Sequence, residues 1–332
     1  MKLAPVFLLV MSLSFWALAA RAADGGGDSL TDDSFCEDPY KSICSVDNKE
    51  SPYLLFYKSV AEMAKFSGDN LKPGHEAFLR DNVEPAKQAL LKAVAAEGVA
   101  LDSYPLFSLN AQAKINNFRI LLPTDRVAAK TEYPTGLGLF VKTYGRDVCP
   151  TDYGFGGYAF WTGLSRGFIP CPGALIRSEV TKELKIANAD LLAEALTFHM
   201  IAHEMGHGLY FGRAPEHQGL ERCFRETYPE FFLRGWRQNY DFDEFVADYW
   251  GSEALAVRLQ DVQARYGIET ARKYLGMSVA GLCGSRGLAK THPDGPFRIQ
   301  FLFNQEKVRQ AVGCKNLAKA GRSSCSLDWQ NN

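Results

Sequence analysis

The chain has 332 residues, of which 46% are hydrophobic and 23% are charged, a composition typical of a globular protein with a sizeable core. Its 37 Lys and Arg residues balance 38 Asp and Glu residues, which leaves a formal net charge of −1. This balance excludes a general positive field, and no nucleic-acid partner is expected.

Residues 1–22 are expected to be a secretory signal peptide. Lys2 precedes an apolar run from Leu3 to Ala20, and Ala20-Arg21-Ala22 supplies a cleavage site. The alternative is an uncleaved anchor, because about 18 apolar residues lie at the short limit for a bilayer span. Pro5 favours cleavage. We therefore expect a protein that is exported to the periplasm or the extracellular space, with no stable membrane insertion after signal removal.

Two segments follow the signal sequence. Residues 23–50 are expected to be a flexible lead-in, because their first part is rich in Gly and acidic residues. Residues 51–130 are expected to be a helical N-terminal region. It would contain helices over residues 52–66 and over residues 85–97, the latter with Pro85 in its first turn.

The segment 131–313 is the predicted catalytic domain, and residues 314–332 are its predicted C-terminal tail. Strand-like patterns over residues 118–122 and 137–144 indicate a small β-sheet ahead of the helices of this domain.

Eight cysteines follow the signal segment, and an even count in an exported chain indicates disulfide bonds. We expect cysteines to pair with their neighbours in the sequence. The expected pairs are Cys36 with Cys44, Cys149 with Cys171, Cys223 with Cys283 and Cys314 with Cys325. The chain has no Cys-x-x-Cys pair, which speaks against a zinc–thiolate site.

Residues 203–207 read His-Glu-Met-Gly-His. Histidines four residues apart on a helix lie on one face, so the side chains of His203 and His207 can bind a single Zn²⁺. Glu204 projects beside them, where it can take a proton from a metal-bound water. The motif thus predicts two metal ligands and a general base. The alternative is a pair of ordinary buried histidines.

The neighbouring residues place this motif on a helix. Asn188 or Asp190 can cap its start, and Gly212 with Pro215 can end it. Apolar residues recur at helical spacing and predict one buried face. They are Ala195, Phe198, Ala202, Met205 and Leu209.

A hydrolytic zinc site needs a third protein ligand. Tyr210 and Arg213 stand where the metzincin pattern requires a glycine and a histidine, which excludes that pattern. Glu244 and Asp248 lie four residues apart in an aromatic-rich, helix-like segment. We predict that Glu244 binds the metal and that Asp248 accepts the second ring N–H of a ligand histidine. A solvated acidic face is the alternative.

A loop with two prolines and a glycine contains His292, and an apolar, helix-like element starts at Phe297. If His292 faces the metal, it can stabilise the oxyanion of a tetrahedral intermediate or occupy the open metal position. A surface histidine is the alternative, because loops are exposed by default.

Together, these three segments resemble the gluzincin metallopeptidases of family 48, which include HtpX-like proteases and CAAX prenyl endopeptidases. The resemblance covers roughly residues 173–303 and rests on short motifs in the same order. They are His203-Glu204-x-x-His207, Glu244-x-x-Ala247-Asp248 and Thr291-His292-Pro293 with Arg298-Ile299.

The resemblance implies His203, His207 and Glu244 as zinc ligands, with Glu204 as the catalytic base. It also implies roles at the site for His292 and Arg298, and an edge strand that pairs with an extended substrate. The candidates for that strand are Leu175, Ile176 and Arg177.

The sequence therefore predicts an α+β fold with a mainly helical, zincin-like (minigluzincin) core and a small β-sheet beside the active-site helix. The predicted function is that of an exported zinc metalloendopeptidase with one Zn²⁺ ion and a protein or peptide substrate. Two alternatives stay open. One is a non-catalytic chaperone or envelope-assembly factor that holds extended clients. The other is a zinc hydrolase acting on non-peptide amides. The oligomeric state is not predicted.

Overall fold

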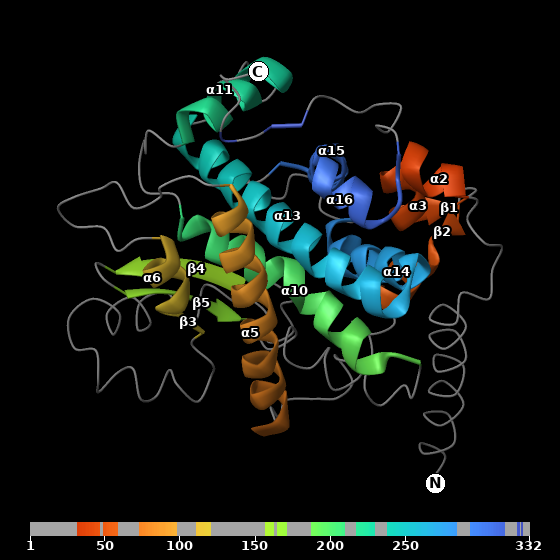
Figure 1. Cartoon of the computed structure of the whole chain (residues 1–332), viewed down its shortest axis with the longest axis horizontal. Coiled ribbons are helices and arrows are strands. Elements are labelled where there is room, and N and C mark those ends of the chain that lie inside the picture. The colour runs from red at the N-terminus through yellow and green to blue at the C-terminus, as the bar shows by residue number, and fades with distance from the viewer. Residues whose placement is uncertain are drawn as a thin grey trace, which may run out of the picture.

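The fold is mostly helical in the residues that the computed structural model describes (Figure 1). The described residues are 32–46, 49–58, 73–97, 111–120, 157–162, 165–170, 187–209, 217–229, 238–283, 293–315, 324–325 and 327. Several predictions lie outside them: the signal peptide, the 137–144 strand, the candidate edge strand at residues 175–177, and His292.

Two long helices form the centre of the molecule. Helix α10 (Ala189–His207) packs along α13 (Gln238–Tyr266), and α5 (Pro73–Ala96) and α14 (Ile268–Val279) pack against both of them (Figure 1). The apolar face predicted for the motif helix is confirmed, because all five of its residues are buried. Asn188 is the N-cap residue, but its side chain makes no cap hydrogen bond and its φ is 58°. The helix ends at His207.

Helix α5 begins twelve residues before Pro85, the predicted start, because its first residue is Pro73. A proline inside a helix removes one backbone hydrogen bond and costs about 3 kcal/mol. The helix continues through Pro85 because the residues that follow it, Ala86, Ala89 and Leu90, are buried. Packing outweighs local propensity here.

A three-stranded sheet lies beside α10 (Figure 1). Its strands are β3 (Phe118–Ile120), β4 (Gly157–Thr162) and β5 (Ser165–Pro170), in the order β3-β5-β4. Strand β5 runs parallel to β3 and antiparallel to β4. The strand predicted over residues 118–122 is confirmed by β3. The β4–β5 hairpin was not predicted.

The N-terminal part of the chain is structured from Asp32 onward. It forms α2 (Asp32–Glu37), α3 (Pro39–Cys44), β1 (Ser45–Val46) and β2 (Lys49–Glu50), and residues 52–58 are helical. The side chains of Phe35 and Ile43 are fully buried. Most of the segment expected to be a flexible lead-in is therefore held by core packing.

Smaller helices complete the described part of the chain. They are α6 (Ala111–Asn116), α11 (Gln218–Thr227), the 3₁₀ turn η2 (Ala280–Leu282), α15 (Gly295–Asn304) and α16 (Glu306–Ala311). The helix predicted after the His292 loop is confirmed by α15. Its N-cap is Asp294, whose carboxylate accepts a hydrogen bond from the Phe297 amide at 3.0 Å. In this part of the chain, no helix is both long and apolar enough to span a bilayer.

The described disulfides join distant segments, and three of the predicted pairs are therefore wrong. The bonds are Cys36–Cys314, Cys44–Cys283 and Cys223–Cys325, with sequence separations of 278, 239 and 102 residues. A disulfide requires a Cα–Cα distance of about 4.4–6.8 Å, and core packing provides it here between distant segments. The predicted Cys149–Cys171 pair lies outside the described residues.

Candidate metal centre

Three side chains from α10 and α13 converge at one point. His203 Nε2 lies 3.3 Å from Glu244 Oε2, and His207 Nε2 lies 3.7 Å from the same oxygen. One ligand atom from each residue lies within 4.8 Å of the other two. His203 and Glu244 are buried, and His207 is partly buried. This group could hold a metal ion.

Two of the three separations between ligand atoms are close to those around a small tetrahedral cation, and the histidine nitrogens lie within 4.8 Å of each other. Metal–ligand bonds of about 2.0–2.1 Å place neighbouring ligand atoms of a tetrahedron roughly 3.3–3.4 Å apart. The two nitrogen–oxygen distances, 3.3 and 3.7 Å, lie at or just above that value. The longer distance, 3.7 Å between His207 Nε2 and Glu244 Oε2, is too long for a good hydrogen bond. Two imidazole nitrogens and one carboxylate oxygen also form a donor set that suits a divalent transition metal.

Close contact between the two helices brings these ligands together. A Cβ on Gly206 of α10 would lie 2.8 Å from the backbone oxygen of Ala247 and 3.2 Å from Cβ of Trp250. A Cβ on Gly251 of α13 would lie 3.3 Å from Cα of His203. Glycine at both positions thus lets α13 approach α10 closely enough for Glu244 to reach the histidines. The sequence analysis did not assign this role to either glycine.

Asp248 and Arg298 lie behind His203. Asp248 Oδ1 is 2.8 Å from His203 Nδ1. Arg298 donates to both carboxylate oxygens of Asp248, from Nη2 at 2.6 Å and from Nε at 2.9 Å. The Arg298 Nη2 atom also lies 3.2 Å from His203 Nδ1. With the Nδ1 proton directed at Asp248, Nε2 is the nitrogen that faces Glu244, and it can bind a metal once it gives up its own proton.

The charges of this network stabilise one another. Burial opposes protonation of His203, but the Asp248 carboxylate raises the pKa of His203 to about 9. Burial works against ionisation of Asp248, yet Arg298 and His203 hold the pKa of that carboxyl well below its usual range. Burial likewise disfavours charge on Arg298, and Asp248 raises the pKa of the guanidinium. Asp248 and Arg298 therefore form a buried ion pair.

Glu204 lies on α10 between the two histidines and is partly exposed. Its charge contributes to the raised pKa of Arg298, so it belongs to the same electrostatic network. Of the other candidate site residues, His292, Leu175, Ile176 and Arg177 lie outside the described residues.

A third histidine of this helix, His199, was not among the predicted site residues. It lies one turn before His203 with the ring centroids 6.4 Å apart, and it is 5% exposed. Burial lowers the pKa of His199 to about 3, although the Asp248 charge works in the opposite direction. The available signal was the spacing, because His199, His203 and His207 are each four residues apart.

His199 should make the metal-free protein sensitive to acid. Its folded-state pKa of about 3 lies below the usual histidine value of 6.5, so below pH 6.5 the unfolded chain binds a proton that the folded chain does not. From pH 7 to pH 5 this should lower the free energy of unfolding by about 2 kcal/mol. The His199→Leu variant should not show this decrease in the free energy of unfolding. Urea denaturation with a chelator present, at both pH values, measures the difference.

The pH-dependent contributions of the other titrating groups cancel in the difference between wild type and variant, because both proteins contain these groups. The stability that His203 contributes rises slightly between pH 7 and pH 5, because its raised folded-state pKa makes that contribution complete only below pH 6.5, and this rise is common to both proteins. Equal pH dependence of the two proteins would show that His199 is protonated in the fold.

No family model, curated protein or solved structure matches this chain significantly.

Proposed function

We propose that this chain is an exported zinc metalloendopeptidase with a zincin-like core. The proposal rests on one observation above all: His203, His207 and Glu244 come together from α10 and α13, and Glu204 directly follows His203 on α10. The donor set and its spacing support Zn²⁺ as the ion. The resemblance to the gluzincin peptidases of family 48 supports peptide-bond hydrolysis.

In this proposal, a bound Zn²⁺ would polarise the scissile carbonyl and lower the pKa of the attacking water. Glu204 accepts the proton of that water and passes it to the leaving amine. The Asp248 carboxylate orients the His203 ring through a hydrogen bond with Nδ1 of that ring. Arg298 in turn positions Asp248 by donating a hydrogen bond to its carboxylate. His292, which lies outside the described residues, is assigned to the developing oxyanion, the first of the two roles that its loop predicts, and the resemblance implies a role for it at the site.

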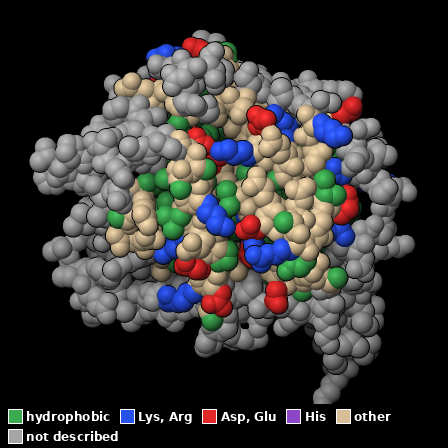
Figure 2. All heavy atoms as spheres, viewed as in Figure 1, with side chains coloured by type: hydrophobic (Ala, Val, Ile, Leu, Met, Phe, Trp, Pro, Cys, Tyr) green, Lys and Arg blue, Asp and Glu red, His purple; other side chains and the backbone are tan. Residues whose placement is uncertain are grey.

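The substrate is proposed to be an extended protein or peptide segment that pairs with the edge strand predicted from the sequence at Leu175, Ile176 and Arg177, which lie outside the described residues. No nucleic-acid partner is proposed. The balanced composition supports this, and so does the face in Figure 2, where Lys and Arg side chains alternate with Asp and Glu. Disulfides persist in oxidising compartments, so the three described bonds support export to the periplasm or the extracellular space.

Metal removal tests the proposal directly. The purified mature chain should contain one Zn²⁺ per molecule by elemental analysis and should cleave casein or a peptide library. A chelator should abolish cleavage, and added Zn²⁺ should restore it, because the water and the carbonyl are activated only when the ion is bound.

The matched control adds the same chelator already saturated with Zn²⁺, which should leave cleavage unchanged. Metal content without any peptide cleavage would contradict the endopeptidase. In that case, binding of extended clients would favour the chaperone alternative, and release of amines from non-peptide amides would favour the other hydrolase.

A further inference from the structure

The N-terminal residues Asp32–Cys44 pack against α15, although most of the chain separates them in sequence (Figure 1). We call these residues, which form α2 and α3, the N-terminal clamp. The Phe35 ring meets Phe303 of α15 edge to face, with the ring centroids 5.6 Å apart. The Arg272 guanidinium lies over the Phe35 ring, 5.5 Å from its centroid. The clamp is therefore part of the core.

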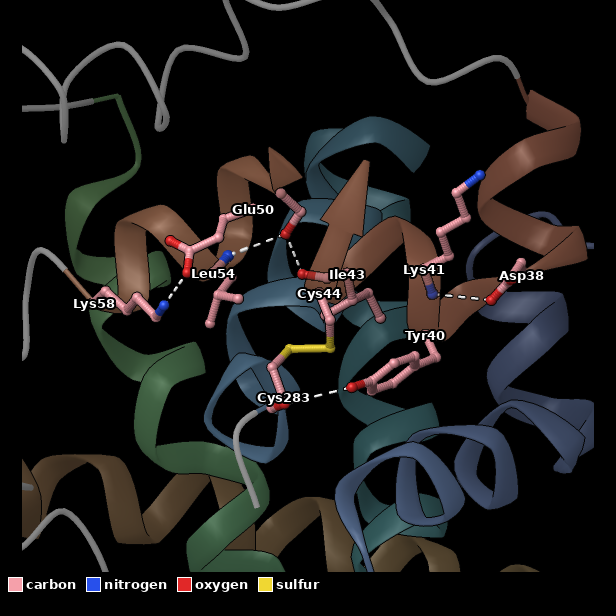
Figure 3. Close-up of a disulfide and its surroundings, with 10 residues drawn as sticks. Asp38, Tyr40, Lys41, Ile43, Cys44, Glu50, Leu54, Lys58 and Cys283 are labelled. Carbon is pink, nitrogen blue, oxygen red and sulfur yellow. Dashed lines mark hydrogen bonds and ion pairs between the residues drawn. A yellow bond between two sulfur atoms is a disulfide. The ribbon is translucent and has the colours of Figure 1, made fainter. Parts of the chain in front are cut away.

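Two disulfides attach the clamp to the chain, one before α15 in the sequence and one after it. Cys44 is bonded to Cys283, which follows η2, and Tyr40 donates a hydrogen bond to the Cys283 carbonyl at 3.4 Å (Figure 3). Cys36 is bonded to Cys314, which follows α16. The stretch between residues 283 and 314 is thus fixed at its two ends to one short segment.

This stretch carries Arg298, which the metal centre depends on. Arg298 lies on α15 and donates to Asp248, and Asp248 orients His203. A bidentate hydrogen bond of this kind requires the guanidinium to be positioned to within about 0.5 Å. The third described disulfide, Cys223–Cys325, joins α11 to the C-terminal tail and does not bracket α15. Arg298 therefore connects the stretch that the clamp holds to the metal centre.

We propose that the N-terminal clamp is a redox-sensitive positioning element for the metal centre. With both disulfides closed, the clamp keeps Arg298 on Asp248 and so keeps His203 oriented for metal binding. A dithiol opens each bond by supplying two electrons and two protons, which yields two protein thiols and one oxidised dithiol. The inference rests on the metal centre of the proposed function and does not require peptide cleavage.

Opening the clamp should weaken Zn²⁺ affinity by about 10–100-fold, the usual effect of losing support behind a ligand histidine. The clamp-open protein replaces Cys36, Cys44, Cys283 and Cys314 with serine in the full mature chain. The matched control is Cys223→Ser with Cys325→Ser, which opens a disulfide outside the clamp. Competition with a chromophoric chelator measures Zn²⁺ affinity, and far-UV circular dichroism checks the fold. If the clamp-open protein does not fold, Cys44→Ser with Cys283→Ser replaces it.

A double-mutant cycle separates positioning from general stability. Arg298→Lys keeps the positive charge but loses the bidentate hydrogen bond to Asp248. In the wild type and in the control it should weaken Zn²⁺ binding about tenfold or more, and in the clamp-open protein by less than about twofold. Additive losses would overturn the inference, as would unchanged Zn²⁺ affinity in the clamp-open protein.

Reduction of the native chain provides the second arm. After treatment with a dithiol, alkylation of the freed thiols so that they cannot bind Zn²⁺, and removal of the reagents, Zn²⁺ affinity should fall at least as far as in the clamp-open protein. An unchanged affinity after both clamp disulfides are reduced would overturn the redox sensitivity. A wild-type chain that binds no Zn²⁺ would instead contradict the metal centre itself.

Discussion

Gly206→Ala should lower the free energy of unfolding by about 3 kcal/mol or more and should disrupt the metal centre. In an open helix, the same change would stabilise by about 1 kcal/mol. At this position the new Cβ would lie 2.8 Å from the oxygen and 2.9 Å from the Cα of Ala247, and both are backbone atoms. Relief requires α13 to move away from α10, which carries Glu244 away from the histidines. Urea denaturation of the metal-free protein and a Zn²⁺ titration measure the two effects.

Two other glycines provide graded controls for this prediction. A Cβ on Gly251 would lie 3.3 Å from its nearest neighbours, so Gly251→Ala should cost less than Gly206→Ala. A Cβ on Gly267 would meet no atom within 4 Å, but its φ of 84° and ψ of 170° lie in a backbone region that is essentially restricted to glycine, so Gly267→Ala should cost about 1–3 kcal/mol through the backbone alone. If Gly206→Ala were no more harmful than Gly251→Ala, the close packing of the two helices would not hold in solution.

Residues close in sequence made part of this site predictable. His203 and His207, or Glu244 and Asp248, share a helix face because four residues make about one turn. The apolar residues on one side of α10 predict which face is buried, and burial confirms it. Periodicity therefore predicts which side chains of one helix point the same way. It does not predict the distance between two helices, which depends here on Gly206 and Gly251.

The wrong predictions concern contacts between distant segments. Pairing neighbouring cysteines assumed that short loops close most easily, but Cys36 and Cys44 each bond to the C-terminal half of the chain. The hydrophobic side chains of Phe35 and Ile43 determine where that segment packs, and no local pattern reveals their partners. Helix α5 shows the same effect, because tertiary packing carries it through Pro85. Such contacts need either a structure or many related sequences.

Glu204→Gln should reduce kcat for peptide cleavage by about 10²–10⁴-fold, the usual contribution of a positioned general base, and should leave Zn²⁺ affinity within a few-fold of wild type. Glutamine keeps the size of the side chain and cannot accept the proton of the attacking water. Glu204 is absent from the His203, His207 and Glu244 group, so its loss removes no ligand. Steady-state kinetics on a peptide, paired with elemental analysis of the variant, measure both quantities.

The matched control is Glu221→Gln on α11, where the carboxylate pairs with Arg225 one turn away on the same helix. It removes one negative charge without touching the metal centre and should leave kcat unchanged. Retained turnover in Glu204→Gln would remove Glu204 from the mechanism even if the metal is present. Loss of Zn²⁺ together with activity would show that Glu204 supports the ion, and the general base would then have to be another residue.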